Sequence, residues 1–318
     1  MTKSQASKLL FEGTRVTGIE FRKGNSMMTA SAAKEVILSA GAINSPQILQ
    51  CSGIGDGSHL QLLGIDVKKS LIGVGQNLQD HLQVRLVYKT SLPTLNDEVS
   101  NWFKKAMVGA QYIFTRTGPL TLAASQVAVF TRSHEKITRP DIQFHMQPLS
   151  ADKPGEGVHP FSAFTSSVCQ LRPHSRGYLK IKTPNPFEYP EIHPNYLSDQ
   201  RDCEVAVNSI KVARKIAHAP ALADVIKDEF VPGRQYQSDE ELLEAARAHS
   251  QTIYHPVSTC KMGNDEVAVV DERLRVHGIQ GLRVADASIM PNIISGNTNA
   301  PAIMIGEKAA DMILEDNR

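Results

Sequence analysis

The stretch from Tyr254 to Gly306 constrains the fold most, because it predicts a strand, a rigid polar loop and a helix in succession. Residues 282–287 predict a short strand that ends at Asp286, and open α/β sheets bind ligands at the carboxyl ends of their strands. Residues 291–301 are dense in Gly, Asn and Pro, which excludes a helix interior. Pro301 suits the first turn of a helix, where its missing N–H costs nothing. One apolar stripe follows that helix, formed by Ala302, Ile303, Ile305, Ala309, Met312 and Ile313.

Two side chains of this stretch have the chemistry to act on a hydroxyl group. His255 is the candidate base, because imidazole titrates near neutral pH and can accept a hydroxyl proton and release it later. Asn297 is its candidate partner, since an amide can hydrogen-bond the same oxygen while negative charge builds there. A histidine before a proline in a loop is more often structural when taken alone. The surrounding motifs therefore decide its interpretation.

Several long motifs follow one another along the chain. Residues 254–263 read Tyr-His-Pro-Val-Ser-Thr-Cys-Lys-Met-Gly, residues 282–291 read Leu-Arg-Val-Ala-Asp-Ala-Ser-Ile-Met-Pro, and residues 295–301 read Ser-Gly-Asn-Thr-Asn-Ala-Pro. Earlier, residues 41–55 read Gly-Ala-Ile-Asn-Ser-Pro-Gln-Ile-Leu-Gln-Cys-Ser-Gly-Ile-Gly, and residues 75–81 read Gly-Gln-Asn-Leu-Gln-Asp-His. In this order they resemble the signatures of the glucose-methanol-choline (GMC) oxidoreductases, over essentially the whole chain.

The GMC resemblance implies FAD as the cofactor and implies no metal. His255 matches the catalytic base of that family, and Asn297 matches the position of its Asn or His partner. The implied cofactor-binding positions are Asp286, Ala287, Asn299 and Ala300, together with Ser39, Ala40 and Gly41 at a strand-to-helix turn near the adenine-bearing half of FAD. The small residues of that turn let a ligand approach the backbone closely.

The activity that the resemblance implies is FAD-linked oxidation of a primary alcohol to an aldehyde. His255 would remove the hydroxyl proton while a hydride passes from the carbinol carbon to flavin N5. The motifs are similar to those of both FAD-linked alcohol dehydrogenases and choline dehydrogenases. A cationic substrate favours a carboxylate or aromatic box, and relatives often carry Glu at the position of Gln126. The glutamine here favours an uncharged alcohol, with choline as the alternative, and the electron acceptor stays open.

Composition excludes several other classes of protein. The chain has 318 residues, enough for two domains, with 41% hydrophobic residues and a formal net charge of +1. This balance does not indicate nucleic acid, an acidic substrate or a membrane surface. No apolar run approaches the roughly 20 residues of a spanning helix, and the start lacks the apolar core of a signal peptide. The four cysteines lack CxxC spacing, so a reducing, cytoplasmic location fits best, either free or peripheral to a membrane.

The predicted fold class is α/β plus α+β. A partial FAD-binding, Rossmann-like domain is completed from both ends of the chain, by residues 1–81 and residues 251–318. The inserted substrate domain spans residues 82–250 and combines an antiparallel sheet with helices. Two of these helices are predicted from an apolar stripe over residues 202–219 and from a capping box that begins at Ser238. The small-molecule substrate is expected to bind at this inserted domain.

The first segment carries the pattern of an α/β unit. Residues 35–41 predict a strand buried on both faces, as in parallel sheets. Ser45 is predicted to cap the next helix with Pro46 at its first position, and Gly53 is predicted to end it.

Other features of the chain have structural interpretations. Residues 73–78 begin like a dinucleotide fingerprint but lack its third glycine, and are interpreted as a loop between domains. Asp80 and His81 are interpreted as a structural pair, and His145 as a structural histidine rather than a cavity residue. Residues 150–160 form a long polar loop, for which a cavity lid and a plain surface loop are equally open.

One signature of the family has no counterpart, since Gly-x-Gly-x-x-Gly does not occur in the sequence. In the family this motif lies near the amino terminus, where a helix start receives the pyrophosphate. The chain is therefore expected to be the carboxyl-terminal part of a GMC enzyme, binding FAD weakly or not at all alone. Two alternatives stay open: a non-catalytic fragment or subunit that needs a partner half, and a flavin-dependent lyase in which His255 is the base.

Overall fold

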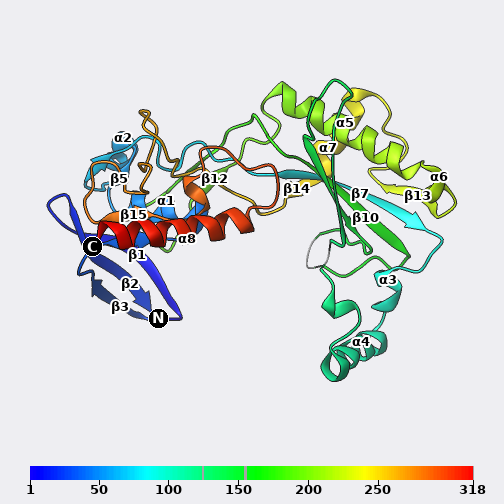
Figure 1. Ribbon diagram of the computed structural model, residues 1–318, viewed down its shortest axis with the longest axis horizontal. Helices are drawn as coiled ribbons and strands as arrows, with labels where there is room; N and C mark the ends of the chain where they lie inside the picture. Colours follow the sequence, from blue (N-terminus) through cyan, green and yellow to red (C-terminus); the bar gives the residue numbers. More distant parts are fainter. Residues whose placement is uncertain (124, 154–155, 318) are drawn as a thin grey trace. The chain divides into compact units, whose positions relative to one another are not determined.

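The structure is a computed structural model that describes residues 1–123, 125–153 and 156–317, and its chain forms two compact units (Figure 1). The first unit comprises Met1–Asp80, His174–Ser198 and Tyr254–Arg318, and the second comprises His81–Pro173 and Asp199–Ile253. The expected insert differs from this division, because residues 174–198 lie in the first unit. Backbone hydrogen bonds explain the difference: Gly177 and Leu78 bond reciprocally, and the Leu179 N–H donates to the Gly75 carbonyl at 2.6 Å.

The sheets of the first unit are small. Its antiparallel sheet runs in the order β1 (Ser4–Glu12), β2 (Arg15–Lys23) and β3 (Ser26–Ser31). The remaining pairs are β4 (Val36–Leu38) with β15 (Leu282–Val284), β5 (Ile54–Gly55) with β6 (Lys69–Ser70), and β11 (Tyr178–Lys180) with β12 (Glu191–His193). The parallel β4–β15 pair joins the beginning and the end of the chain in one unit, as the predicted fold class requires.

Strand β4 is less buried than predicted. Leu38 is buried, but Ile37 is 42% exposed, so the prediction of a strand covered on both faces is wrong. Covering both faces requires a packed layer on each side of the sheet. Here β4 pairs with β15 alone among the described strands, and Leu38 joins the core of the unit on one side.

Helix α1 (Gly41–Cys51) begins earlier than predicted. Ser45 is not its cap, because it lies inside the helix and its hydroxyl accepts a hydrogen bond from the Ala40 N–H at 3.0 Å. Gly41, with φ of +80°, makes the sharp turn out of β4 instead. The predicted end is confirmed, because the helix stops before Gly53, whose φ of +85° suits glycine.

Pro46 lies inside α1 and leaves one helical carbonyl without its usual donor. A proline has no N–H, so the Ala42 carbonyl four residues earlier loses its intrahelical hydrogen bond. The hydroxyl of Thr259 replaces this bond, donating to the Ala42 oxygen at 2.6 Å. Thr259 belongs to the same motif as His255, so this hydrogen bond attaches the histidine segment to α1.

Thr259→Val should therefore destabilise the first unit by about 1–3 kcal/mol, because it leaves the buried Ala42 carbonyl unsatisfied without changing the side-chain shape. In a Pro46→Ala background the restored N–H can bond that carbonyl, so the same change should cost clearly less. Denaturant unfolding of the four proteins in this double-mutant cycle measures the difference. An equal loss in both backgrounds would contradict the assignment, and the exposed Thr29→Val is the control.

The core of the first unit is built around three further helical elements, α2 (Gly57–Leu62), the 3-10 turn η2 (Ala287–Ile289) and α8 (Asn299–Asp316). Pro301 lies in the first turn of α8, as predicted. Of the predicted stripe, Ile305 and Ala309 are buried whereas Ile303 is exposed, so the buried face is narrower than the sequence suggested. Core side chains from β1, α1, β15, η2 and α8 pack into one cluster.

The second unit is an antiparallel sheet packed against helices, as predicted for the insert (Figure 1). Its strands are β7 (Leu82–Thr90), β8 (Val127–Thr131), β9 (Ile142–Gln147), β10 (Ala163–Gln170), β13 (Ile226–Val231) and β14 (Ser250–Thr252), in the order β13-β7-β10-β9-β8 with β14 also on β7. Its helical elements are α3 (Leu95–Glu98), α4 (Trp102–Thr115), η1 (Pro119–Thr121), α5 (Gln200–Ala217), α6 (Pro220–Ala223) and α7 (Asp239–His249).

Helices α5 and α7 cover this sheet, and both match the sequence predictions. Helix α5 packs against β7 and β10, and α7 packs against α5. The capping box of α7 is formed by Ser238 and Glu241. Helix α5 buries Ala206, Ile210 and Ala213 on the face toward the sheet.

Candidate active site

Asp286, two residues after β15, ties α1 to η2. Its Oδ2 accepts hydrogen bonds from the Gly41 N–H at 2.9 Å and from the Ser45 hydroxyl at 2.6 Å. Its Oδ1 accepts from the Ser288 N–H at 2.8 Å. The carboxylate thereby fixes the β4–α1 turn against η2, which is where two groups of implied cofactor-binding residues meet.

His255 is held by its own backbone and by a carboxylate from a distant segment. Its N–H donates to Asp80 Oδ1 at 2.9 Å, across 175 residues of sequence. Asp80 Oδ2 accepts a hydrogen bond from the Tyr196 hydroxyl. The preceding residue, Tyr254, has a φ of +63°, which is unusual for a bulky side chain. These constraints fix where the imidazole lies, and only 9% of His255 is exposed.

The loop that carries Asn297 is joined to the histidine segment by Gln79. The Gln79 side chain donates to the Pro291 carbonyl and to the Ser258 hydroxyl, both at 3.2 Å, and accepts from the Ile293 N–H at 3.1 Å. Its backbone exchanges hydrogen bonds with Val257. One side chain thus sets the spacing between the two segments.

The structure brings the two predicted catalytic side chains together. Asn297 Nδ2 lies 3.5 Å from His255 Nε2, although the residues are 42 positions apart. The amide nitrogen carries only hydrogens, so its approach suits a ring nitrogen that holds a lone pair. Asn297 is exposed whereas His255 is buried, so the pair presents its polar edge at the surface of the first unit.

The environment of His255 favours the neutral ring. Burial lowers the pKa of His255 from its usual 6.5, and the nearby charge of Asp80 opposes that shift without cancelling it. At neutral pH the imidazole is therefore mainly unprotonated and can act as a base.

The implied FAD positions fall on two open edges of the first unit. Ser39 and Ala40 are exposed at the carboxyl end of β4, and a Cβ added at Gly41 would meet no atom within 4 Å. Asn299 and Ala300 are exposed at the start of α8, where Thr298 makes no side-chain cap. Helix geometry leaves the first N–H groups without intrahelical partners, so this end can receive polar atoms of a cofactor. These residues fit a flavin nucleotide.

Ala287 and Asp286 differ from the exposed positions, because their polar atoms already bond the protein. The Ala287 carbonyl accepts from the Ser258 N–H at 3.3 Å. Both residues are half-buried, so their contact with a cofactor stays a prediction. Among the described residues no group of three or more His, Cys, Asp or Glu side chains could hold a metal ion.

Sequence reasoning missed the residues that position His255. From the sequence, Asp80 was interpreted only as a structural partner of His81, whose Nε2 lies 3.2 Å from the Leu171 carbonyl in the second unit. Gln79 and Tyr196 carried no signal, since their partners are far away in sequence. The one available hint was the Gly-Gln-Asn-Leu-Gln-Asp-His motif, whose residues 75–80 lie in the first unit while His81 begins the second. Residues 73–78, interpreted from the sequence as a loop between domains, lie inside the first unit.

Three expectations for the second unit have different outcomes. His145 lies on β9, and its interpretation as a structural histidine stays a prediction. In the loop 150–160, residues 154–155 lie outside the described residues, and the lid interpretation stays a prediction. The described part is tied by His159, whose Nδ1 lies 2.9 Å from the Ser150 hydroxyl. In the segment before β8, Gln126 is exposed and Ala124 lies outside the described residues.

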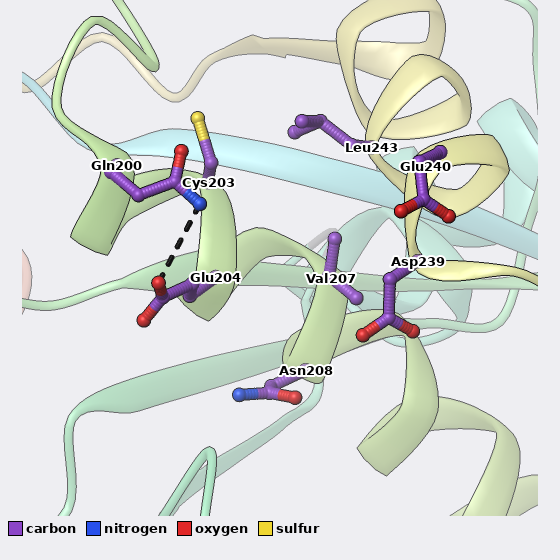
Figure 2. Close-up of a pocket in the computed structure, with 8 residues that line it drawn as sticks. All are labelled: Gln200, Cys203, Glu204, Val207, Asn208, Asp239, Glu240 and Leu243. Atoms are coloured by element: carbon purple, nitrogen blue, oxygen red, sulfur yellow. Dashed lines mark hydrogen bonds between the residues drawn. The ribbon is translucent and has the colours of Figure 1, made fainter.

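A separate pocket lies between α5 and α7 of the second unit, and Figure 2 shows its lining. Its residues are Gln200, Cys203, Glu204, Val207, Asn208, Asp239, Glu240 and Leu243. Gln200 donates to Glu204 at 3.5 Å, and Asp239 pairs with Lys211 at 2.5 Å. None of the predicted site residues lines this pocket.

Comparisons with known proteins agree on one family. Two models described as GMC oxidoreductase match residues 1–83 and residues 173–306. The oxygen-dependent choline dehydrogenase of Acinetobacter baumannii is 42% identical over 316 residues, which cover 98% of this chain and 57% of that protein. The chain thus spans little more than half the length of this curated relative. No helix among the described residues is both long and apolar enough to cross a membrane.

Solved structures give the same result. A formate oxidase of Aspergillus oryzae, in a study of FAD modification, is 25% identical with a TM-score of 0.91, covering 98% of this chain and 60% of that one. A fungal aryl-alcohol oxidase is 26% identical with a TM-score of 0.82, again covering 98% of this chain and 60% of the other.

Proposed function

The chain belongs to the GMC oxidoreductase family, whose cofactor is FAD, and we propose that its first unit carries the base and hydrogen-bond donor of an alcohol-oxidising site. The observation that carries this proposal is the meeting of His255 Nε2 and Asn297 Nδ2 at 3.5 Å, in surroundings that lower the pKa of the histidine. A neutral imidazole beside an amide donor suits removal of a hydroxyl proton.

The flavin, when bound, supplies the acceptor for the two electrons and the hydrogen that leave the carbinol carbon. Ser39, Ala40 and Gly41 would hold the nucleotide at one edge, and Asn299 and Ala300 would offer N–H groups at the other. Asp286 fixes the spacing between these edges through Gly41 and Ser45, as a positioning residue.

The chain's own part in the reaction is proton transfer and orientation. The Asn297 amide donates to the alcohol oxygen and holds it beside His255. His255 Nε2 accepts the hydroxyl proton, so the oxygen gains negative charge as the carbinol carbon is oxidised and an aldehyde forms. Asp80 keeps the histidine segment in place through the backbone bond at 2.9 Å and favours the protonated ring that results.

The proposed substrate is an uncharged primary alcohol. The family resemblance aligns Gln126 with a position at which relatives often carry Glu, and a glutamine there would not supply the carboxylate that favours a quaternary ammonium group. Choline is the second candidate, because the chain is 42% identical to a protein named choline dehydrogenase.

Anaerobic mixing of an alcohol with the FAD-loaded enzyme, in which a nucleotide-binding half is supplied to this chain, tests this function. We expect a medium-chain primary alcohol to bleach the oxidised flavin and to yield one aldehyde per flavin, with choline clearly slower. Bleaching by choline alone would replace the preferred substrate with the second candidate. Conversion of substrate without flavin reduction would indicate lyase chemistry and would overturn the proposal.

Asp80→Asn should move the acid limb of the pH profile to lower pH. The negative charge of Asp80 raises the pKa of His255, so its removal lets burial lower that pKa further. The neutral ring is the active form, so kcat/KM falls as pH drops through this pKa, and the variant should retain activity further into acid. A pH profile of kcat/KM measures the shift.

Tyr196→Phe is the matched control for Asp80→Asn. It removes the hydroxyl that donates to Asp80 but leaves the carboxylate charge in place. We expect no downward movement of the acid limb in this variant. Equal downward shifts in both variants would show that the charge of Asp80 does not set the pKa of His255.

A further inference from the structure

Helix α4 of the second unit exposes an unusual number of large apolar side chains. None of its 14 residues is buried. Trp102 is 79% exposed and Phe114 is 85% exposed, and Phe103, Met107 and Ile113 are also exposed. Contiguous apolar surface of this kind on a protein in water marks a binding surface. In Figure 1, α4 lies away from the sheet formed by β7 and β10 of its own unit.

These side chains share one face of the helix. With 3.6 residues per turn, Trp102, Phe103, Met107, Ile113 and Phe114 fall within an arc of about 140°. The half-buried residues of α4 are Val108, Gly109 and Tyr112, and all three lie outside that arc. The helix therefore rests on its own unit by its other side, and its apolar face points outward.

Basic side chains predominate on α4 and in the segment that follows it, whereas Asp97 and Glu98 precede α4 on α3 and Glu135 comes after this stretch. Residues 99–134 contain Lys104, Lys105, Arg116 and Arg132 but no Asp or Glu. Both lysines project from the side of α4 opposite to or beside the apolar arc, as in helices that lie in a membrane interface. Anionic lipid headgroups complement this charge.

We propose that α4 is an interfacial helix that binds the surface of an anionic lipid bilayer, with Trp102, Phe103 and Phe114 inserted among the acyl chains. With 14 residues it is shorter than the roughly 20 of a spanning helix, so it lies along the surface. The net charge of +1 conceals this feature, because acidic residues elsewhere balance the basic segment. The inference does not depend on the proposed catalytic function.

The sole tryptophan of the chain lies on this face, so its fluorescence reports on α4 alone. The protein is mixed with vesicles of phosphatidylcholine, with or without phosphatidylglycerol. We expect a blue shift of the emission and co-sedimentation with the anionic vesicles, and much weaker binding to the zwitterionic ones. Lys104→Gln combined with Lys105→Gln should weaken binding to anionic vesicles about tenfold or more.

Phe114→Ala should lower vesicle affinity at least about tenfold, since a buried aromatic side chain is lost. Leu62→Ala is the matched control, because Leu62 is also 85% exposed but lies on α2 of the first unit, and it should leave binding unchanged. Emission that stays unshifted with vesicles overturns the proposal. A blue shift without vesicles that grows with protein concentration, alongside dimers in sedimentation, overturns it in favour of a second copy.

Discussion

In a complete enzyme, with a nucleotide-binding half supplied to this chain, replacing His255 with alanine is expected to slow the reduction of bound flavin by alcohol about 10²–10⁴-fold, the usual contribution of a positioned general base. The bound flavin should change little, because the implied FAD contacts come from other residues. The histidine backbone bond to Asp80 does not depend on the imidazole, so the segment keeps its place. Rapid mixing under anaerobic conditions measures the rate, and flavin absorbance measures occupancy.

His277→Ala is the control for this prediction. His277 also lies in the first unit and its Nε2 is 3.0 Å from the Gly263 carbonyl, so its loss removes an imidazole hydrogen bond without touching Asn297. Its flavin reduction should stay within a few-fold of the unaltered protein. Unchanged turnover in His255→Ala, or an equal loss in both variants, would remove His255 from the mechanism.

Arg283→Met is expected to destabilise the first unit by about 3–5 kcal/mol, the usual effect of removing one partner from a buried ion pair. The Arg283 side chain is 3% exposed. It donates to Glu35 at 2.7 Å, to the Arg273 carbonyl at 2.7 Å and to Asp316 at 2.5 Å. Arg283 thus joins β15 to the segment before β4 and to the end of α8. Methionine has a similar volume, but it leaves the Glu35 and Asp316 carboxylates without the guanidinium.

Arg275→Met provides the comparison, because Arg275 is 50% exposed and pairs with Asp271 four residues away. Exposed pairs of this type contribute about 0–1 kcal/mol. Denaturant unfolding under the same conditions should show that Arg283→Met loses several-fold more free energy of unfolding than Arg275→Met. Equal losses would show that the buried network around Arg283 does not hold the unit together.

Local patterns predicted much of the fold. Four features could be predicted because each depends on neighbours a few residues apart. They are the capping box of α7, the apolar stripe of α5, the short strand β15 and the proline in the first turn of α8. The start of α1 could not be predicted from the sequence. Ser45 has the chemistry of a cap, but its hydroxyl bonds Asp286 across 241 residues of sequence. A long-range partner therefore overrode the local preference.

The candidate site, too, could be predicted only in part from the sequence. His255 and Asn297 were found because each lies in a distinctive motif, and the structure brings them together. Asp80, Gln79 and Tyr196 hold that arrangement but were missed, since a carboxylate, an amide and a phenol in loops have many possible partners. The exposed Ile37 was missed for a related reason: the number of neighbours of a strand cannot be read from its own residues.

One measurement tests most directly whether a single buried imidazole is the base. It is the pH dependence of anaerobic flavin reduction by a primary alcohol, compared between the unaltered protein and His255→Ala. We predict that the rate of the unaltered protein is constant at neutral pH and falls as pH drops through a midpoint below 6.5, because burial lowers the pKa of His255. The residual rate of the variant should lack this limb. The same acid limb in both proteins would contradict the account.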